Sequence, residues 1–267
     1  MKFHFSRKQL IIPYGLFLAL FVVLPLLFIV YYAFTDGSTG AFTLSNFGKF
    51  LTSGTSLSTL LLSVGVAILT TLFCLLIAYP IAYVLARSKM KKKTVLLMLF
   101  VLPMWINFVL RINALREFLD LIGLLGNANL FNTVLGMIYD FLPFMILPLY
   151  TTLIKMDKNL LEASSDLGGN AFTTFIKVTL PMSMQGIISG ITMVFMPTMT
   201  NYVISDTLGL GHVTIIGKLI EDCFGARADW NLGSAIALIL LVIIFATMVF
   251  TGGFKDDEAG ARGAGLW

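Results

Sequence analysis

Charged side chains are scarce in this sequence. Asp, Glu, Lys and Arg make up 12% of the 267 residues, whereas 58% are hydrophobic and the mean hydropathy is +0.92. A soluble domain of this length could bury a core, but it could not cover its surface with so few charges. The composition therefore excludes an ordinary soluble globular protein and predicts a chain that lies in a lipid bilayer.

Residues that build catalytic or metal sites are also scarce. The only histidines are His4 and His212, and the only cysteines are Cys74 and Cys223, with no ligand-like spacing around them. The stretch "LGLGH" at 208–212 lacks the strand-to-helix context and the lysine-serine pair of a phosphate-binding loop. We therefore expect no catalytic residue, no metal site, no disulfide and no cofactor held by this chain.

Most of the sequence consists of long apolar runs. A helix rises about 1.5 Å per residue and needs about 20 apolar residues to cross about 30 Å of hydrocarbon. Five runs meet this length and a sixth is shorter; in the fifth, Gly186 and Gly190 are spaced for close helix approach. The sequence predicts an all-α polytopic membrane protein with one domain over residues 10–250 and six transmembrane helices, at Leu10–Phe34, Leu60–Ala86, Thr94–Leu110, Leu130–Ile154, Met182–Ser205 and Leu232–Phe250.

The basic residues predict the orientation of these helices. With the N-terminus placed in the cytoplasm, thirteen of the eighteen lysines and arginines fall on the inner side, and five of these thirteen lie in the run "RSKMKKK" at 87–93. This asymmetry favours both tails, residues 1–9 and 251–267, in the cytoplasm. The basic residues that give the net charge of +4 flank apolar runs. We therefore expect membrane lipid as a partner, and no nucleic acid.

One polar stretch, "LLEASSDLGGNAFTTFIKVTLP" from Leu160 to Pro181, interrupts the apolar runs. Gly168 and Gly169 can end a first helix, and Asn170 can cap a second one that leads to Pro181. The first helix has an apolar stripe at helical spacing, formed by Leu160, Leu161, Ser164 and Leu167. We predict a cytoplasmic helical hairpin in the loop 155–181, suited to docking into a groove of a soluble partner.

The spacing of this stretch resembles the "EAA" loop of bacterial ABC-importer permeases. The family pattern is Glu-Ala-Ala, three residues, Gly, nine residues, Ile, one residue and Leu-Pro; here Ser164 replaces the second Ala and Val178 replaces Ile. The resemblance implies a coupling helix that sits in a cleft of an ABC ATPase subunit, with polar contacts from Glu162 and a turn at Gly168. It assigns ATPase coupling to Glu162, Ala163, Ser164, Gly168, Leu180 and Pro181.

A wider resemblance covers about residues 10–250. The stretches "LPMWINFVLRINALREFL" and "LPFMILPLYTTLIKMDKNLLEAS" are similar to the spermidine/putrescine permease subunits. The resemblance implies a non-catalytic permease subunit in a bacterial inner membrane, which forms half of the translocation path of an ATP-driven importer for polyamines. It also implies three kinds of partner: an ABC ATPase dimer that holds ATP and Mg, a second related permease subunit and an external substrate-binding protein.

Few residues could recognise such a cargo. A polyamine requires carboxylates for its ammonium groups and aromatic faces for its methylenes. An ionisable residue inside a span, such as Asp140, is a functional candidate by default. The candidate path residues are Trp105, Asn107, Asp140, Tyr202 and Asp206. Alternative roles are packing for Trp105, an ion pair with an arginine of a neighbouring helix for Asp140, and helix or loop capping for Asp206.

Two other functions are compatible with parts of the sequence. A permease for another small solute would have the same coupling loop, since that loop does not encode the cargo. An ion-coupled secondary transporter would keep the intramembrane carboxylates, but no inverted repeat is visible to support it. A purely structural membrane scaffold leaves the long coupling motif unexplained.

Overall fold

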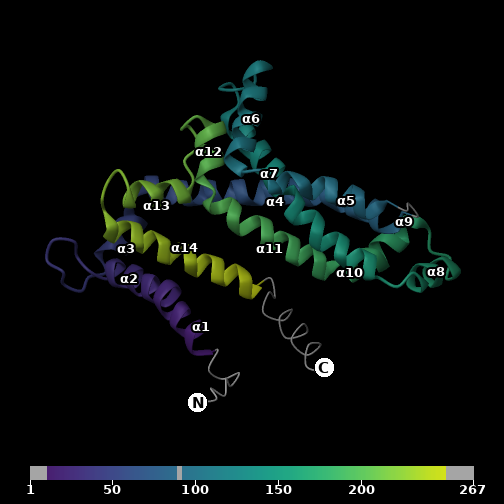
Figure 1. The fold of residues 1–267 in the computed structure, drawn as a ribbon, viewed down its shortest axis with the longest axis horizontal. Coiled ribbons are helices and arrows are strands. Elements are labelled where there is room, and N and C mark those ends of the chain that lie inside the picture. Colours follow the sequence, from purple (N-terminus) through teal and green to yellow (C-terminus); the bar gives the residue numbers. More distant parts are fainter. Residues whose placement is uncertain (1–10, 89–91, 251–267) are drawn as a thin grey trace, which may run out of the picture. The chain divides into compact units, whose positions relative to one another are not determined.

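The computed structural model describes residues 11–88 and 92–250 (Figure 1). The predicted tails at 1–9 and 251–267 lie outside these residues. Helices and the loops between them make up the described chain, and its extended pairing is limited to one bridge between Thr35 and Phe42. The predicted all-α class is therefore confirmed, as expected for a chain that must satisfy its backbone hydrogen bonds within a bilayer.

The elements are mostly short helices set between a few long ones. In chain order they are α1 (Ile11–Leu18), η2 (Ala19–Val23), α2 (Leu24–Ala33), α3 (Ser45–Thr52), α4 (Gly54–Arg87), α5 (Lys93–Val101), η3 (Leu102–Trp105), α6 (Phe108–Leu121), α7 (Asn129–Lys155), α8 (Asn159–Asp166), α9 (Ala171–Thr174), η4 (Phe175–Thr179), α10 (Leu180–Met182), α11 (Met184–Thr200), α12 (Tyr202–Gly209), α13 (Ile216–Phe224) and α14 (Trp230–Phe250).

Four helices of the described chain are long and apolar enough to cross a membrane. The number rises to six when each of two bent helix pairs counts as one span. The four unbroken spans agree with the first, second, fourth and sixth predicted helices to within two residues, except that the second begins six residues earlier than predicted; they are Ile12–Ala33, Gly54–Arg87, Asn129–Lys155 and Trp230–Val249.

The third predicted span, Thr94–Leu110, is wrong as a single helix. Lys93–Trp105 and Phe108–Leu121 meet at an angle of 95°. Pro103 lacks a backbone N–H and lies in the single 3₁₀ turn that ends the first segment. Asn107 then starts a new helix, because its side-chain oxygen accepts hydrogen bonds from the backbone N–H groups two and three residues later, at 3.0 and 3.3 Å.

The fifth predicted span, Met182–Ser205, is also interrupted. The chain bends by 63° between Ala171–Met182 and Met184–Thr200. The long helix ends at Thr200, and Asn201 caps a separate helix, α12, by accepting a hydrogen bond from the N–H of Ile204 at 3.4 Å. Ser205 therefore belongs to α12 and not to the span.

The described chain divides into two compact units, one of residues 11–58 with 219–243 and one of residues 59–218 with 244–250. In the first unit, two asparagines link α14 and α3 to the end of α2. The Asn231 side chain donates hydrogen bonds to the carbonyls of Tyr32 and Thr35, at 3.0 and 2.7 Å, and Asn46 donates to those of Ala33 and Thr35. These bonds satisfy carbonyls that the end of α2 leaves without helical partners.

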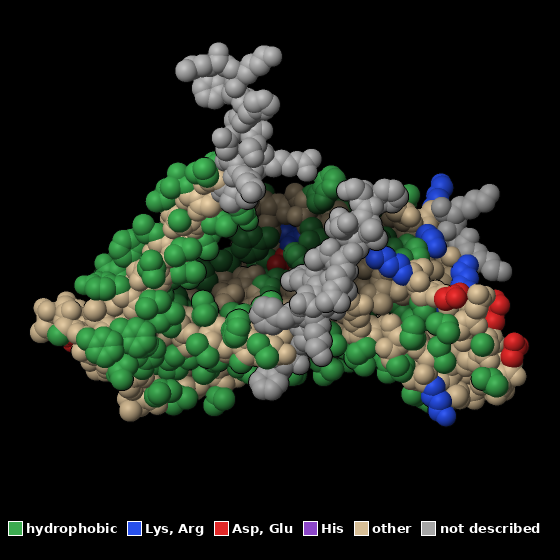
Figure 2. Space-filling view, turned by 90° about the horizontal axis from the view of Figure 1, so that it is seen from below, with side chains coloured by type: hydrophobic (Ala, Val, Ile, Leu, Met, Phe, Trp, Pro, Cys, Tyr) green, Lys and Arg blue, Asp and Glu red, His purple; other side chains and the backbone are tan. Residues whose placement is uncertain are grey.

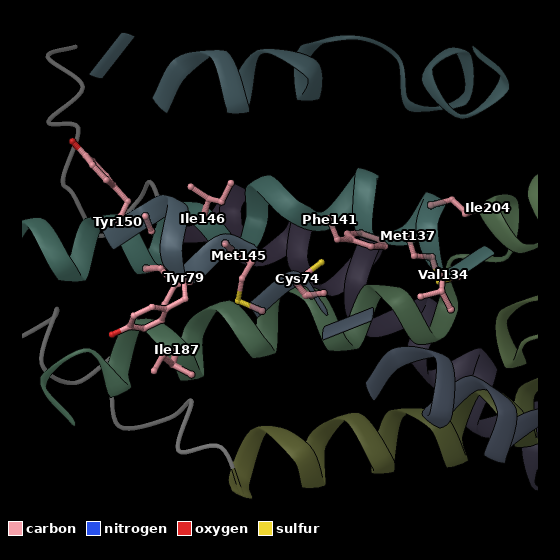
Figure 3. Close-up of a cluster of buried hydrophobic side chains, with 14 of the residues drawn as sticks. Cys74, Tyr79, Val134, Met137, Phe141, Met145, Ile146, Tyr150, Ile187 and Ile204 are labelled. Atoms are coloured by element: carbon pink, nitrogen blue, oxygen red, sulfur yellow. The ribbon is translucent and has the colours of Figure 1, made fainter. Parts of the chain in front are cut away.

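The second unit has a buried core formed by α4, α7, α11 and α12 (Figure 3). Met145 and Ile146 of α7 are fully buried there. A Cβ added to Gly186 would lie 2.7 Å from the hydroxyl oxygen of Thr152, and one added to Gly190 would lie 2.5 Å from the Met145 sulfur. The two glycines therefore let α7 and α11 pack closely, as their spacing predicted.

Candidate functional site

A helical hairpin formed by α8 to α10, residues 159–182, occupies the predicted coupling loop. Gly168 takes the left-handed conformation (φ +80°) just after α8. The N–H of Gly169 donates to the carbonyl of Ser164, and the N–H of Gly168 donates to that of Ser165, each at 2.9 Å. These two bonds make the Schellman motif, which ends a helix and satisfies its last carbonyls. The sequence predicted this turn from the glycine pair.

The two arms of the hairpin are held together by side chains. The Asn170 side chain accepts a hydrogen bond from the N–H of Thr173 at 2.8 Å and so caps α9, as predicted. The hydroxyls of Ser164 and Thr174 lie 2.8 Å apart and link the first arm to the second. Ser164 stands where the family motif has Ala, and here its hydroxyl bonds within the hairpin.

The outer face of the hairpin combines acidic and apolar side chains. Glu162 and Ala163 are exposed, as is Pro181, whereas Leu180 is half-buried. Charged side chains gather at the end of the second unit that carries α8 and α9 (Figure 2). Two large apolar side chains are also exposed there, Leu167 at 89% and Phe172 at 71%. The sequence placed Leu167 on the apolar stripe of the first helix, whereas Phe172 was not singled out; its position just after a glycine turn was the available signal.

A set of aromatic contacts joins the hairpin to α4. The Phe175 ring lies edge-on to Tyr79 and Tyr83 of α4, with ring centres 5.5 and 6.0 Å apart. The Tyr79 hydroxyl lies 2.8 Å from that of Ser183, which sits at the bend between α10 and α11. One tyrosine therefore contacts both the hairpin and the bend that leads into α11.

A buried ion pair occupies the interior around α7. Arg111 of α6 donates a hydrogen bond to the carboxylate of Asp140, and both side chains are almost fully buried. The same guanidinium donates to the carbonyl of Pro103 at 2.7 Å and lies 5.6 Å from the Tyr139 ring centre. Arg111 therefore ties both sides of the broken span to α7. This is the arginine pairing that the sequence left open as an alternative for Asp140; Arg111 itself was not singled out.

The other two candidates of this region lie at the break itself. Trp105 ends η3 and is 86% exposed. The Asn107 side chain is engaged as the cap of α6. Their assignment to the cargo path stays a prediction.

Tyr202 and Asp206 lie one turn apart on α12 and share a cation. The Lys218 ammonium is 3.2 Å from an Asp206 carboxylate oxygen and 5.7 Å from the centre of the Tyr202 ring. The Asp206 side chain is 45% exposed and that of Lys218 is 25% exposed. The structure thus divides the two predicted carboxylates between a buried pair and a partly exposed one. Lys218 was not among the residues singled out from the sequence.

The two cysteines are free and buried. Burial raises the pKa of the Cys223 thiol, which keeps it in its unreactive protonated form. Across residues 11–88 and 92–250, no group of three or more His, Cys, Asp or Glu side chains is placed to hold a metal ion.

Comparison with known proteins gives consistent relatives. The sequence profile of the family "Binding-protein-dependent transport system inner membrane component" matches residues 78–254. The chain is 34% identical over 247 residues to the spermidine/putrescine transport system permease protein PotB of Escherichia coli, covering 85% of this chain and 90% of that protein. It is 38% identical over 197 residues to PotB of Haemophilus influenzae, covering 68% of each chain.

Solved structures share the fold at low sequence identity. A crystal structure of a bacterial ABC transporter involved in the import of the acidic polysaccharide alginate superposes with a TM-score of 0.69, at 14% identity and 94% coverage of both chains. The same type of transporter in complex with an alginate pentasaccharide-bound periplasmic protein gives a TM-score of 0.71, at 12% identity and 91% coverage.

Proposed function

Because the chain belongs to the family of binding-protein-dependent transport system inner membrane components, we propose that it serves as one permease subunit of an ATP-driven importer of polyamines. The relatives named as spermidine/putrescine permeases, which match most of the chain, support this cargo. The family makes the chain a transport subunit. A permease for another small solute is the alternative, whereas an ion-coupled secondary transporter has no support from a family that depends on binding proteins.

The hairpin is the observation that supports ATP hydrolysis in a separate chain. Its turn is set by Gly168, its arms are linked by Ser164 and Thr174, and its outer face presents Glu162, Leu167 and Phe172. Exposed apolar side chains beside a carboxylate suit docking into a groove of a soluble protein. In this proposal the groove belongs to an ABC ATPase dimer, which holds ATP and Mg. Glu162 and Ala163 contact it, while Leu180 and Pro181 join the hairpin to the membrane.

Movement of the docked hairpin has a physical route into the membrane part. A shift of Phe175 pushes on the Tyr79 and Tyr83 rings of α4. The Tyr79–Ser183 hydrogen bond connects the same tyrosine to the bend before α11. Since packed aromatic rings resist compression, we infer that the hairpin, α4 and the start of α11 move together when the ATPase closes.

The remaining partners follow from the family and from charge. A shared fold with a transporter solved together with a periplasmic protein supports an external binding protein, and half of a translocation path implies a second related permease. The excess of basic residues on the side of the hairpin supports a bacterial inner membrane location with both termini and the hairpin in the cytoplasm.

Gentle purification of the tagged chain from its own membrane tests the coupling role. We expect an ATPase and a second permease to co-purify with the wild-type chain and the ATPase to be lost with Glu162→Arg. Glu117, which is also an exposed glutamate, lies on α6, and Glu117→Arg is the matched control that should retain the ATPase. Putrescine-stimulated ATP hydrolysis is then measured on the assembled complex. Retention of the ATPase by both variants would contradict the assignment of Glu162.

A further inference from the structure

We propose that Tyr202 and Asp206 form a binding site for one ammonium group of the cargo, and that Lys218 occupies this site as a built-in ammonium which the cargo displaces. The inference rests on the proposed import of polyamines and names the part of the cargo that this site recognises. It assigns Lys218 a role as an internal competitor.

The chemistry of the site is that of ammonium recognition. Tyr202 and Asp206 are four residues apart on α12, so both project from the same face of the helix. An ammonium group is recognised by a carboxylate that accepts a charge-assisted hydrogen bond and by an aromatic face that attracts the cation. Lys218 meets both conditions, with its nitrogen 3.2 Å from Asp206 and 5.7 Å from the Tyr202 ring centre.

The backbone that carries Lys218 is fixed. The N–H of Ile216, at the start of α13, donates to the buried Ser63 hydroxyl at 2.7 Å. Gly217 packs directly on the carbonyl of Thr200, where an added Cβ would collide with the backbone. Since the two residues before Lys218 are held against α4 and α11, exchange of the ammonium moves the flexible lysine side chain and leaves this backbone in place.

Partial exposure makes this ion pair exchangeable. Asp206 and Lys218 keep contact with solvent. In ion pairs of that kind the closed form is only about a few-fold more populated than the open form. A cargo ammonium that replaces Lys218 also leaves Asp206 neutralised, so the exchange buries no unpaired charge. The Arg111–Asp140 pair is different, because both its members are buried and opening it would leave a carboxylate without a partner.

The acylation rate of Lys218 gives a direct test. The purified complex is treated with an amine-acylating reagent, and modified peptides are quantified by mass spectrometry with putrescine, with 1,4-butanediol, or with neither. We expect putrescine to raise Lys218 acylation about two- to six-fold, because it increases the fraction of Lys218 outside the site. The neutral diol should leave the rate unchanged. Exposed Lys49 serves as the internal reference for reagent consumed by putrescine.

Substitutions distinguish a competitor from a structural partner. With Lys218→Gln the site is empty, so the putrescine concentration for half-maximal ATP hydrolysis should fall about two- to six-fold. With Asp206→Asn it should rise, and Asp206→Glu should restore part of the response. Tyr202→Phe keeps the ring face, whereas Tyr202→Leu should weaken the response. A structural ion pair predicts instead that Lys218→Gln and Asp206→Asn impair the response alike.

The outcomes separate this inference from the proposed function. If polyamines stimulate ATP hydrolysis but Lys218 acylation is unchanged, and Lys218→Gln behaves like Asp206→Asn, the ammonium exchange is overturned and the importer stands. If putrescine exposes Lys218 but no polyamine stimulates ATP hydrolysis, the ammonium site is supported and polyamine import fails.

Discussion

The hairpin and the interior around α7 both depend on glycine, but for opposite reasons. At Gly168 an added Cβ would meet nothing within 4 Å, yet the backbone has a φ of +80°. At Gly186 the backbone is helical, and an added Cβ would lie 2.9 Å from the carbonyl oxygen of Pro148. Glycine is needed at 168 because of the left-handed backbone conformation, and at 186 because neighbouring atoms leave no space for a side chain.

This difference separates two kinds of damage. The hairpin is exposed and locally bonded, so a change there should alter docking to a partner while the membrane part stays folded. The interior is close-packed and holds a buried ion pair, so a change there should lower stability before any partner is involved. Stability and ATPase recovery, measured on the same variants, can therefore test the distinction.

The largest effect is expected when the buried ion pair loses its cation. Arg111→Ala leaves the Asp140 carboxylate buried without a charge partner and removes one of the hydrogen bonds to the carbonyl of Pro103, at a cost of about 3–5 kcal/mol. Unfolding of the purified chain by heat or by denaturing detergent measures the loss. The double variant Arg111→Met with Asp140→Leu removes both charges and should recover at least half of it. Equal losses in the single and double variants would show that the charges are not the cause.

A smaller loss of stability is expected when α7 and α11 are forced apart. In Gly186→Ala the new methyl group meets the Thr152 hydroxyl and the Pro148 carbonyl, which should cost about 1–3 kcal/mol. Gly190→Ala is the matched variant and should cost less, because its nearest neighbour is the adaptable Met145 side chain. Thermal unfolding of both variants gives the order, and a more stable Gly186→Ala would contradict the close packing.

The sequence predicted the long helices because a bilayer leaves few alternatives. A run of about 20 apolar residues can satisfy its backbone in hydrocarbon only as a helix, so four spans were placed to within a few residues. The breaks near Asn107 and Ser183 were missed for a physical reason. The first break coincides with Pro103 and the side-chain cap of Asn107, and the Ser183 hydroxyl at the second is hydrogen-bonded with Tyr79 of α4. Hydropathy carries no information on any of these.

The site was predictable only where its determinants are local. The Schellman turn and the Asn170 cap were visible because glycine and asparagine act within a few residues of their own positions. An arginine pair for Asp140 was only an alternative and neither partner was identified, because the partners of Asp140 and Asp206 come from other helices. The exposure of Leu167 and Phe172 was also missed, since periodicity places a side chain on a stripe without saying what covers it.

In the hairpin, backbone conformation should decide which substitution is tolerated. Gly168→Ala has room for its methyl group, but the left-handed conformation costs about 1–2 kcal/mol, or at least a five-fold loss of the docking-competent turn. Gly168→Asn should retain most of it, because asparagine adopts this conformation more readily. ATPase recovery should fall for Gly168→Ala alone, with the unfolding temperature of the membrane part unchanged in both. Equal recovery of the ATPase by the two variants would argue against the turn as the determinant.

The smallest effect is expected from the hydroxyl pair that links the arms. Ser164→Ala restores the residue of the family motif but removes the hydrogen bond to Thr174, worth about 0.5–1.5 kcal/mol. Because the pair lies near the surface, the lower half of this range applies and ATPase binding should weaken by less than about five-fold. Thr174→Val should weaken it by a similar factor. If the hydroxyls act only on each other, the double variant should lose no more than either single one. Additive losses would mean that one hydroxyl contacts the ATPase directly. The hydroxyl pair would then belong to the docking surface as well as to the internal hydrogen bonds of the hairpin.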